Sequence, residues 1–413
     1  CIRDRYIPLH LYATTTAKNV GTLTLETDAV MLAEAVVTAE APQVQVVEDT
    51  LVYTSSAYRT PEGAMLEELV KKLPGAEIDD EGNVKINGKD LSKIMVDGKE
   101  FFGGDVKTGL KNLPVDMIEK LKTYDKKSDL ARITGIDDGE EETVLDLTVK
   151  KGMNQGWFGN ADVAGGTEDR YMGRFMLNRF VDKTQVSVVG SANNVNDQGF
   201  SGGGGPPRWR RNNGLTATKM LGVNFATQTD KLELGGSARY NYQDGDIASI
   251  GSTEDFLPDG NSYSNSNSRQ RNKAKNFNAD FRMEWKPDSM TNIIFRPNFS
   301  YGKTDNLSNS ESGTFSSDPY SLVSDPNNWL NLEKILNPDD DPLRSIRINA
   351  INSGSLSDNK SVSTDATLQL NRKLNDKGRN VTFRGRFGYT NNDNNQYTES
   401  ETHYFCLLYT SPS

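Results

Sequence analysis

The chain has 413 residues, and its 57 acidic and 47 basic side chains give a formal net charge of −10. This charge argues against a nucleic acid as partner, because phosphate backbones are bound by clusters of Lys and Arg. Mean hydropathy is −0.64, and no run reaches the ~20 apolar residues of a transmembrane helix. The 36 Gly, 16 Phe and 15 Tyr are nevertheless too many for a disordered tail. A membrane barrel stays open, because its strands hide their hydrophobicity by alternation.

Only two cysteines occur, Cys1 and Cys406, and each lies in a terminal piece that breaks the local pattern. We interpret residues 1–5 and 406–413 as non-native termini similar to translated cloning adaptors. The alternative is a disulfide between the two cysteines, which the sequence leaves open.

Two segments precede the main pattern. Residues 6–38 are typical of the last strands of a small β-sandwich followed by a linker. Residues 49–151 predict a compact α+β unit, in which a helix begins near Pro61 and ends at Pro74-Gly75. Short strands separated by turns such as Asp97-Gly98 follow.

The stretch 275–303 sets the character of the rest of the chain. Apolar residues such as Phe277 and Phe281 alternate with polar ones such as Asp280. A helix would place these three on one face, so the period predicts strands. The turn 286–289 then joins two strands, each with one apolar and one polar face.

Connection lengths indicate where these strands belong. The connections 181–183, 229–230, 286–289 and 374–377 are short, whereas 194–214, 243–274 and 304–360 are long and polar. Only the first connection, 167–169, departs from this alternation. Outer-membrane barrels combine short periplasmic turns with long extracellular loops. We therefore predict barrel strands near residues 156–166, 170–180, 184–193, 215–228, 231–243, 275–286, 290–303, 361–373 and 380–391.

One face of each predicted strand is mainly apolar. Contact with lipid requires such a face, since a charge at mid-bilayer costs about 2–4 kcal/mol. The opposite face must then line the lumen, where its charges contact either substrate or another part of the chain. The alternative is a soluble β-sandwich with one wet face. The lumen-facing charges that we predict are Asp280, Arg282, Glu284, Arg384 and Arg386.

Four segments, in this order, resemble TonB-dependent outer-membrane receptors. Residues 26–40 are similar to the linker before the plug, and 64–102 to the start of the plug, with its LPG helix end and VDG turn. Residues 112–125 and 139–152 are similar to later plug strands. Between these last two segments the chain is acidic where typical plugs are Gly-rich, as in a plug subgroup paired with a distinct barrel domain.

The resemblance implies a mainly β fold, with a partial transmembrane antiparallel β-barrel after a small α+β plug and the end of a sandwich extension. The plug would be 49–151 and the barrel part 152–405. Nine strands are well short of the ~22 of plugged transporters. The expectation is therefore the N-terminal part of a longer protein.

Two groups of residues are candidate substrate contacts. Arg208, Trp209, Arg210 and Arg211 lie in a Gly-rich loop and are suited to an anionic or sugar ligand. The alternatives are a solvated loop or a lipopolysaccharide contact. Phe101 and Phe102 follow the VDG turn and would lie at the plug apex, with plug packing as the alternative.

Enzyme chemistry is poorly supported. His10 and His403 lie at opposite ends of the chain, so neither a catalytic triad nor a His metal cluster can be assembled. The acidic runs 137–142 and 339–341 lack the spacing of a calcium loop and are better explained as solvated turns. We expect no cofactor and no metal.

The function implied by the resemblance is energy-dependent uptake of a bulky or scarce solute, such as a siderophore, glycan or peptide. Its partners would be outer-membrane lipid, an inner-membrane TonB-type energy transducer, the solute itself and a surface lipoprotein. The plug and N-terminus would face the periplasm. The alternative functions are a non-transporting surface protein for adhesion or partner anchoring, and a soluble periplasmic β enzyme.

Overall fold

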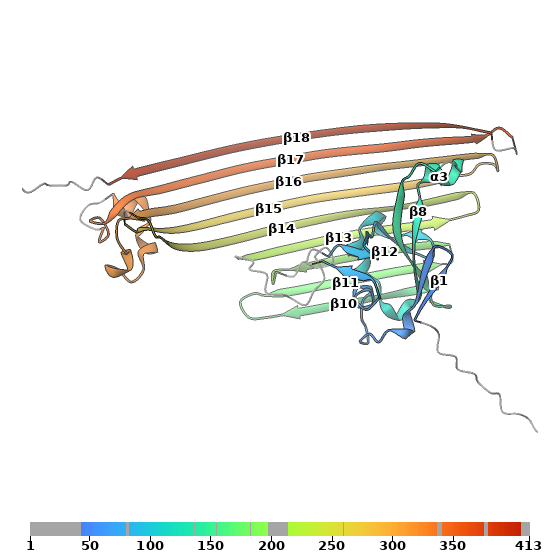
Figure 1. Cartoon of the computed structure of the whole chain (residues 1–413), viewed down its shortest axis with the longest axis horizontal. Coiled ribbons are helices and arrows are strands. Elements are labelled where there is room, and N and C mark those ends of the chain that lie inside the picture. Colours follow the sequence, from blue (N-terminus) through green and yellow to red (C-terminus); the bar gives the residue numbers. More distant parts are fainter. Residues whose placement is uncertain are drawn as a thin grey trace, which may run out of the picture. The chain divides into compact units, whose positions relative to one another are not determined.

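The structure is a computed structural model that describes residues 43–79, 82–135, 137–153, 155–181, 183–196, 214–258, 260–336, 341–375 and 379–405. It contains a small α+β domain and a nine-stranded antiparallel sheet (Figure 1). These two parts confirm the predicted mainly β fold class. The terminal segments 1–5, 6–38 and 406–413 lie outside the described residues, and so do Cys1 and Cys406.

The small domain holds a six-stranded sheet of order β1-β2-β8-β9-β6-β7 and a three-stranded sheet of order β3-β4-β5. Its strands are β1 (Val44–Val47), β2 (Thr50–Thr54), β3 (Ala76–Ile78), β4 (Val84–Ile86), β5 (Lys89–Asp90), β6 (Lys93–Val96), β7 (Lys99–Glu100), β8 (Ile118–Lys127) and β9 (Glu141–Val149). Its α-helices are α1 (Leu66–Val70), α2 (Val106–Asn112) and α3 (Asp129–Thr134). Short 3-10 turns span Ser55–Ala57, Phe102–Gly104 and Val115–Met117.

Local capping signals place α3, and an apolar core holds α1 and α2 against the six-stranded sheet. Ser128 caps α3 by accepting a hydrogen bond from the Ala131 amide at 3.0 Å, and Gly135 ends it with a φ of +72°. The core is formed by fully buried side chains that include Leu66, Leu69, Ile94, Leu113, Leu121 and Leu145. No helix in the described part of the chain is long and apolar enough to cross a membrane.

The large sheet is a meander in which every strand pairs antiparallel with its neighbour in sequence, from β10 to β18 (Figure 1). Each predicted strand is present. The observed strands are β10 (Gln155–Gly165), β11 (Tyr171–Val181), β12 (Thr184–Asn193), β13 (Leu215–Gln228), β14 (Leu232–Asp255), β15 (Ser262–Trp285), β16 (Thr291–Phe315), β17 (Arg347–Lys373) and β18 (Asn380–Tyr404).

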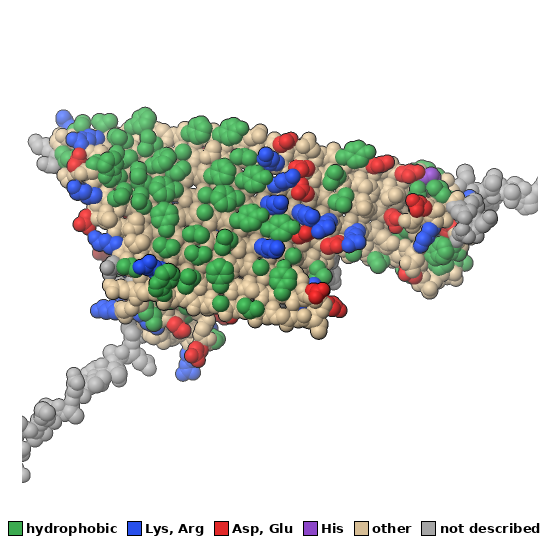
Figure 2. Space-filling view, turned by 180° about the vertical axis from the view of Figure 1, so that it is seen from behind, with side chains coloured by type: hydrophobic (Ala, Val, Ile, Leu, Met, Phe, Trp, Pro, Cys, Tyr) green, Lys and Arg blue, Asp and Glu red, His purple; other side chains and the backbone are tan. Residues whose placement is uncertain are grey.

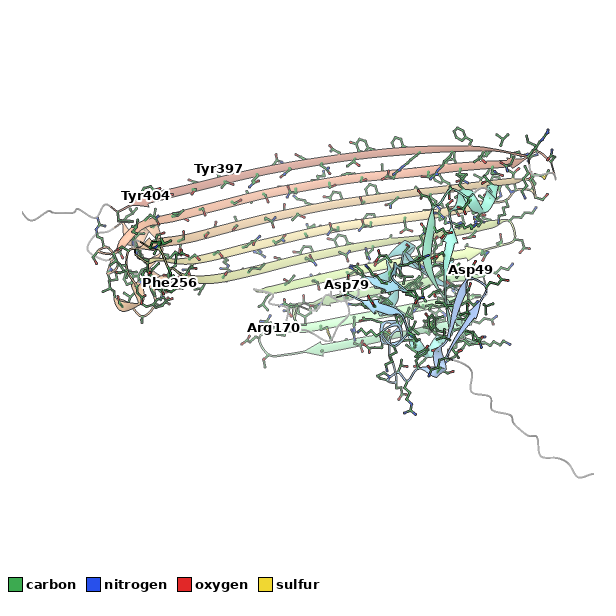
Figure 3. All side chains as sticks on the ribbon, in the orientation of Figure 1. Asp49, Asp79, Arg170, Phe256, Tyr397 and Tyr404 are labelled. Atoms are coloured by element: carbon green, nitrogen blue, oxygen red, sulfur yellow. The ribbon has the colours of Figure 1, made fainter. Side chains whose placement is uncertain are left out.

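The later strands are much longer than predicted, and this corrects two of the long loops. Strand β14 has 24 residues and β17 has 27. Most of 243–274 is therefore paired strand, with register intact to Asp255↔Ser262. Both ends of 304–360 are paired strand as well, up to Phe315 and from Arg347. These stretches are polar on both faces, so an alternation of apolar and polar residues does not reveal them. They form strands because the adjacent strands on each side provide partners for their backbone hydrogen bonds. Phe256, Tyr397 and Tyr404 mark this distal end of the sheet (Figure 3).

A compact insertion connects β16 to β17 at the distal end. It contains two 3-10 turns (Pro319–Ser321 and Pro326–Trp329) and α4 (Leu332–Ile335). The fully buried Arg347 donates from Nε to Asp341 Oδ2 at 2.9 Å and lies 5.1 Å from the Phe315 ring. Asp341, the described member of the acidic run 339–341, is therefore committed to an internal ion pair.

Register divides the side chains of the large sheet between two faces. One face of the turn-side half is apolar and exposed, with Leu368, Phe383 and Phe387 among its residues. Figure 2 shows apolar side chains gathered over this half and bounded by a band of charged ones. The other face carries the polar partners of the same strands.

Truncation of Leu145 to Ala tests the small-domain core. We expect a loss of about 2–5 kcal/mol, because a cavity opens among buried side chains. The measurement is the urea concentration at which protease cleaves the small domain in the full-length protein. Val46, which is 72% exposed, provides the control, since Val46→Ala should change stability by less than about 0.5 kcal/mol. Equal sensitivity of both variants would contradict the assigned core.

Candidate functional site

The small domain contacts the polar face of the large sheet through hydrogen bonds. The amide of Phe102 donates to Asn224 Oδ1 at 2.9 Å, and Gln185 Nε2 donates to the Val96 carbonyl at 3.2 Å. Arg239 donates to Thr108 Oγ1 at 3.2 Å and also pairs with the carboxylate of Asp105, which caps α2. These contacts come from β12, β13 and β14, so they extend across several strands of one face.

An apolar contact lies beside these hydrogen bonds. Met176, Phe180, Val189 and Met220 on β11 to β13 join the core cluster of the small domain. Gly222 makes room for Phe102, because a Cβ there would lie 3.1 Å from the Phe102 ring. These apolar side chains of the sheet are therefore covered by the small domain.

Phe101 and Phe102 are buried, with 1% and 2% of their surfaces exposed. Their rings meet edge to face, with centroids 4.9 Å apart. Both side chains are packed within the small domain and against the sheet in this structure. The adjacent Gly103 has a φ of +52° and lies so close to the Asp280 carboxylate that a Cβ would collide with it.

Eight side chains at the edge of this contact form a group that we name the charged cluster. Its centre is Glu284, which is 2% exposed, and Arg282, which is 8% exposed. The cluster consists of Asp129 and Arg132 from α3, Glu233 from β14, Arg282 and Glu284 from β15, Lys286 after β15, and Asn292 and Arg296 from β16.

Two guanidiniums tie the cluster together. Arg132 Nη2 lies 2.6 Å from Glu284 Oε2 and 3.2 Å from Asp129 Oδ1. Arg282 Nη2 lies 2.8 Å from the same Glu284 oxygen and 3.5 Å from Asp129 Oδ1, and Arg282 also pairs with Glu233. Glu284 Oε1 accepts from Asn292 at 2.8 Å. The small domain and the sheet thus share one ionic network.

Neighbouring cations lower the pKa of two buried carboxyls of the small domain, Asp129 in the cluster and Glu100 beside it. Burial alone would raise the pKa of Asp129, but the guanidiniums of Arg296, Arg282 and Arg132 outweigh burial and lower it. Glu100 is similar: burial would raise its pKa, and Lys93 followed by Arg282 lowers it instead. Removing one partner from such a network leaves an uncompensated buried charge.

The contact is tightly filled around Gly103, whereas two larger pockets, of about 540 and 340 Å³, lie between the small domain and the turn end of the sheet. Glu100, Gly103, Asp280 and Arg282 help to line a cavity of about 20 Å³, enough for about one water molecule. No bulky solute fits there in this conformation.

The predicted lumen-facing charges divide into two groups. Asp280, Arg282 and Glu284 on β15 lie against the small domain. Arg384 and Arg386 on β18 are exposed, and Arg386 lies 3.5 Å from Asp365. Register places both groups on the same face of the sheet. Arg208, Trp209, Arg210 and Arg211 lie outside the described residues.

Sequence reasoning missed α3 and its two charged contacts, Asp129 and Arg132. The sequence does contain signals for α3, since Ser128 is a good N-cap and Gly135 a good helix end. The acidic residues around them led us to interpret the segment as a turn. Arg296 and Glu233 were also missed, although each occupies a polar position of a predicted strand.

The acidic run 137–142 connects α3 to β9, which begins at Glu141. Asp137 Oδ1 accepts from the Gly139 amide at 2.9 Å, and Asp138 Oδ2 accepts from Ser128 Oγ at 2.6 Å. Across the described ranges, no group of three His, Cys, Asp or Glu is arranged to hold a metal ion.

No family model and no curated protein matches this chain. Solved structures are similar to it at low identity. The outer membrane transporter YddB from Escherichia coli has 10% identity and a TM-score of 0.32, with 89% of this chain and 56% of that chain covered. The ferric yersiniabactin uptake receptor FyuA from Yersinia pestis has 11% identity and a TM-score of 0.27, with 88% and 62% covered.

A third similar structure is BauA, the ferric preacinetobactin receptor from Acinetobacter baumannii, with 11% identity, a TM-score of 0.26, and 86% and 60% covered. The chain spans between 54% and 62% of the length of the solved structures it matches.

Replacement of Arg282 by Met tests the charged cluster. Removing one partner of a buried pair costs about 3–5 kcal/mol, so hydrogen exchange in residues 129–134 should accelerate on the order of 100-fold or more. Arg386→Met is the matched control, because this arginine lies on the same face in an exposed pair worth about 0–1 kcal/mol. Equal exchange in the two variants would refute the coupling.

The pH dependence of the same exchange tests Asp129. Its pKa is lowered in the folded state, so its stabilisation is complete above the ordinary value of about 3.9 and is lost as pH falls through the lowered value. After correction for intrinsic rates, protection should be flat from about pH 8 to about pH 5 and fall only below about pH 4. The acid step should shrink in Asp129→Asn. A step of unchanged size in that variant would assign it to another group.

Proposed function

We propose that this chain is part of an outer-membrane β-barrel receptor that takes up a bulky or scarce solute, with the small domain as the plug. The observation that carries the proposal is the exposed apolar face of the turn-side half of the large sheet. Exposed apolar area of this extent is costly in water and is what lipid requires. The opposite, polar face is occupied by the small domain, as a plug occupies a lumen.

The small-domain contact supports a gating role. Its apolar part, around Phe102 and Met220, anchors the domain to β11–β13. Its ionic part, the charged cluster, joins α3 to β14–β16. Water can replace the partners of charged groups more readily than it can solvate an apolar core. A pull on the plug would therefore open the side of β14–β16 first.

The proposed mechanism makes and breaks no covalent bond. Distal loops bind the solute, and an inner-membrane TonB-type energy transducer pulls the periplasmic side of the plug and opens a path. The plug and the short turns would face the periplasm, and the lipid of the outer membrane would surround the apolar face. The solute class is a siderophore, a glycan or a peptide, and a surface lipoprotein is a further proposed partner.

The long strands favour a second candidate function. At about 3.3 Å per residue, the 24 residues of β15 extend well past the ~9–11 residues that span a bilayer. Their polar distal halves and the insertion between β16 and β17 would project from the cell. Such a projection suits a non-transporting surface protein for adhesion or partner anchoring.

Energised uptake separates the two functions. Cells carrying the full-length protein would be offered a labelled ferric chelate, an oligosaccharide and an oligopeptide. The transport proposal expects uptake of one probe that is lost when the energy transducer is deleted, while surface binding persists. Surface binding without any transducer-dependent uptake would support the adhesion alternative. Recovery of the protein in the soluble fraction without detergent would contradict both.

A further inference from the structure

Among the described residues, the polar face of the large sheet is free of charge over most of its distal half. Register places the residues concerned in continuous rows across β14 to β18. None of them is Asp, Glu, Lys or Arg. We name them the neutral wall, which is every second residue of β14 from Asn241 to Thr253, of β15 from Ser264 to Asn276, of β16 from Gly302 to Thr314, of β17 from Asn349 to Ser361 and of β18 from Asn392 to Tyr404.

Composition does not explain the neutral wall. Charged residues make up 25% of the chain, whereas the wall consists mostly of Asn, Ser, Thr and Gln. On β14 its charged neighbours are Arg239 on the turn side and Asp255 on the distal side. Arg239 pairs with Asp105 of the small domain. The wall therefore begins where the ionic contact with the small domain ends.

The opposite face of the same strands is charged at this level. Arg271 Nη2 lies 3.0 Å from Asp244 Oδ2, and Arg269 Nη2 lies 2.7 Å from Asp246 Oδ2. Farther along the sheet, Lys303 Nζ lies 3.0 Å from Asp358 Oδ2. The strands thus carry charges here, but only on the face turned away from the small domain. The absence of charge is specific to the polar face.

Asparagines of the neutral wall have unused hydrogen-bonding capacity. Asn272 on β15 is the register partner of Asn306 on β16, and Asn359 on β17 lies one row closer to the turns. Within the described part of the chain, the Oδ1 atoms of these three residues accept no hydrogen bond. Because an amide both donates and accepts, a solute with hydroxyl groups would find partners on adjacent strands, about 4.8 Å apart.

A solute that enters a lumen loses part of its water, and the wall must replace the lost hydrogen bonds. An ionised group that leaves water without an opposite charge is strongly disfavoured, and the neutral wall offers no such charge. A hydroxyl group exchanges its bonds to water for bonds to amides and hydroxyls at little net cost. The wall is therefore suited to discriminate between solutes by their charge.

From this distribution of charge we propose that the neutral wall selects an uncharged, hydroxyl-rich solute, namely a neutral oligosaccharide. Of the other two proposed solute classes, a ferric chelate with ionised ligands and a peptide with charged termini are both disfavoured. The inference rests on the proposed function, because the wall borders a path for solute only if the polar face lines a lumen. It deepens that function by naming one solute class and the residues that select it.

The test measures transducer-dependent uptake of matched probes by cells that carry the full-length protein. The neutral probes are oligosaccharides from starch, cellulose and mannan. Their charged counterparts carry a carboxylate or an amine at the reducing end. We expect the neutral probe of at least one series to enter on the order of 10-fold faster than its carboxylate counterpart, because the wall has no cation to compensate the carboxylate.

Carboxylates placed on the wall should change this preference. In a variant that combines Asn272→Asp, Asn306→Asp and Asn359→Asp, uptake of the amine probe relative to the neutral probe should rise on the order of 10-fold or more. The reason is that a surface lined by one sign of charge concentrates the opposite charge. The matched control replaces three exposed asparagines of the opposite face by Asp and should keep the wild-type ratio. These asparagines are Asn309, Asn352 and Asn395.

Two results would overturn the inference. One is transducer-dependent uptake of the carboxylate probe, the ferric chelate or the oligopeptide as fast as that of the neutral probes. The other is an unchanged ratio of amine to neutral probe in the wall variant, once its presence in the outer membrane is verified. If that variant fails to reach the membrane, the wild-type comparison alone decides. Absence of transducer-dependent uptake for every probe would instead contradict the proposed function.

Discussion

The register of the nine antiparallel strands in their turn-side halves is the constraint on which the rest of the structure depends. The register shifts at Thr314 and Phe315, which lie at the distal end of β16. A slip of one residue would exchange the two faces of a strand. Because β14 and β15 stay paired from Leu232↔Trp285 to Asp255↔Ser262, every apolar residue in their turn-side halves points to one face. The apolar surface and the polar face that receives the small domain both follow from that register.

The contact between the small domain and the sheet is apolar at one end and ionic at the other. On β11–β13, apolar side chains such as Met176 and Phe180 complete the core of the domain. On β14–β16, the contact is made by buried charges around Glu284 and Arg282. An apolar contact of this kind resists water, whereas an ionic one can exchange its partners for water. This difference gives the small domain one side held by apolar packing and one side held by ion pairs.

The sequence predicted those parts of the fold in which polarity differs between the two faces. Phe277, Phe281 and Trp285 revealed β15, and the same alternation revealed the other strands of the sheet. It could not reveal the distal half of β15, where Ser and Asn occupy both faces and the pairing depends on neighbouring strands. Alternation also gives no distances between strands and helices. It therefore could not predict the contact between Arg132 and Glu284, which are 152 positions apart in the sequence.

In the candidate site, too, the sequence revealed the type of residue but not its partners. Asp280, Arg282 and Glu284 were recognisable as charges on the polar face of a strand, but their partners depended on a six-residue helix, α3. Phe101 and Phe102 were recognisable as an apolar pair beside glycines. Only the fold decides whether such a pair faces solute or core, because both settings favour aromatic residues.

The contact of the apolar face with lipid is the central claim, and a pair of spin labels tests it most directly. Leu368 and Thr367 are neighbours on β17 and lie on opposite faces, since Leu368 pairs with Phe295 and Thr367 with Arg296. In vesicles, a label at Leu368→Cys should be relaxed by oxygen dissolved in the lipid, and one at Thr367→Cys should not. A label at Leu368→Cys that is instead relaxed by a water-soluble nickel chelate would contradict the account.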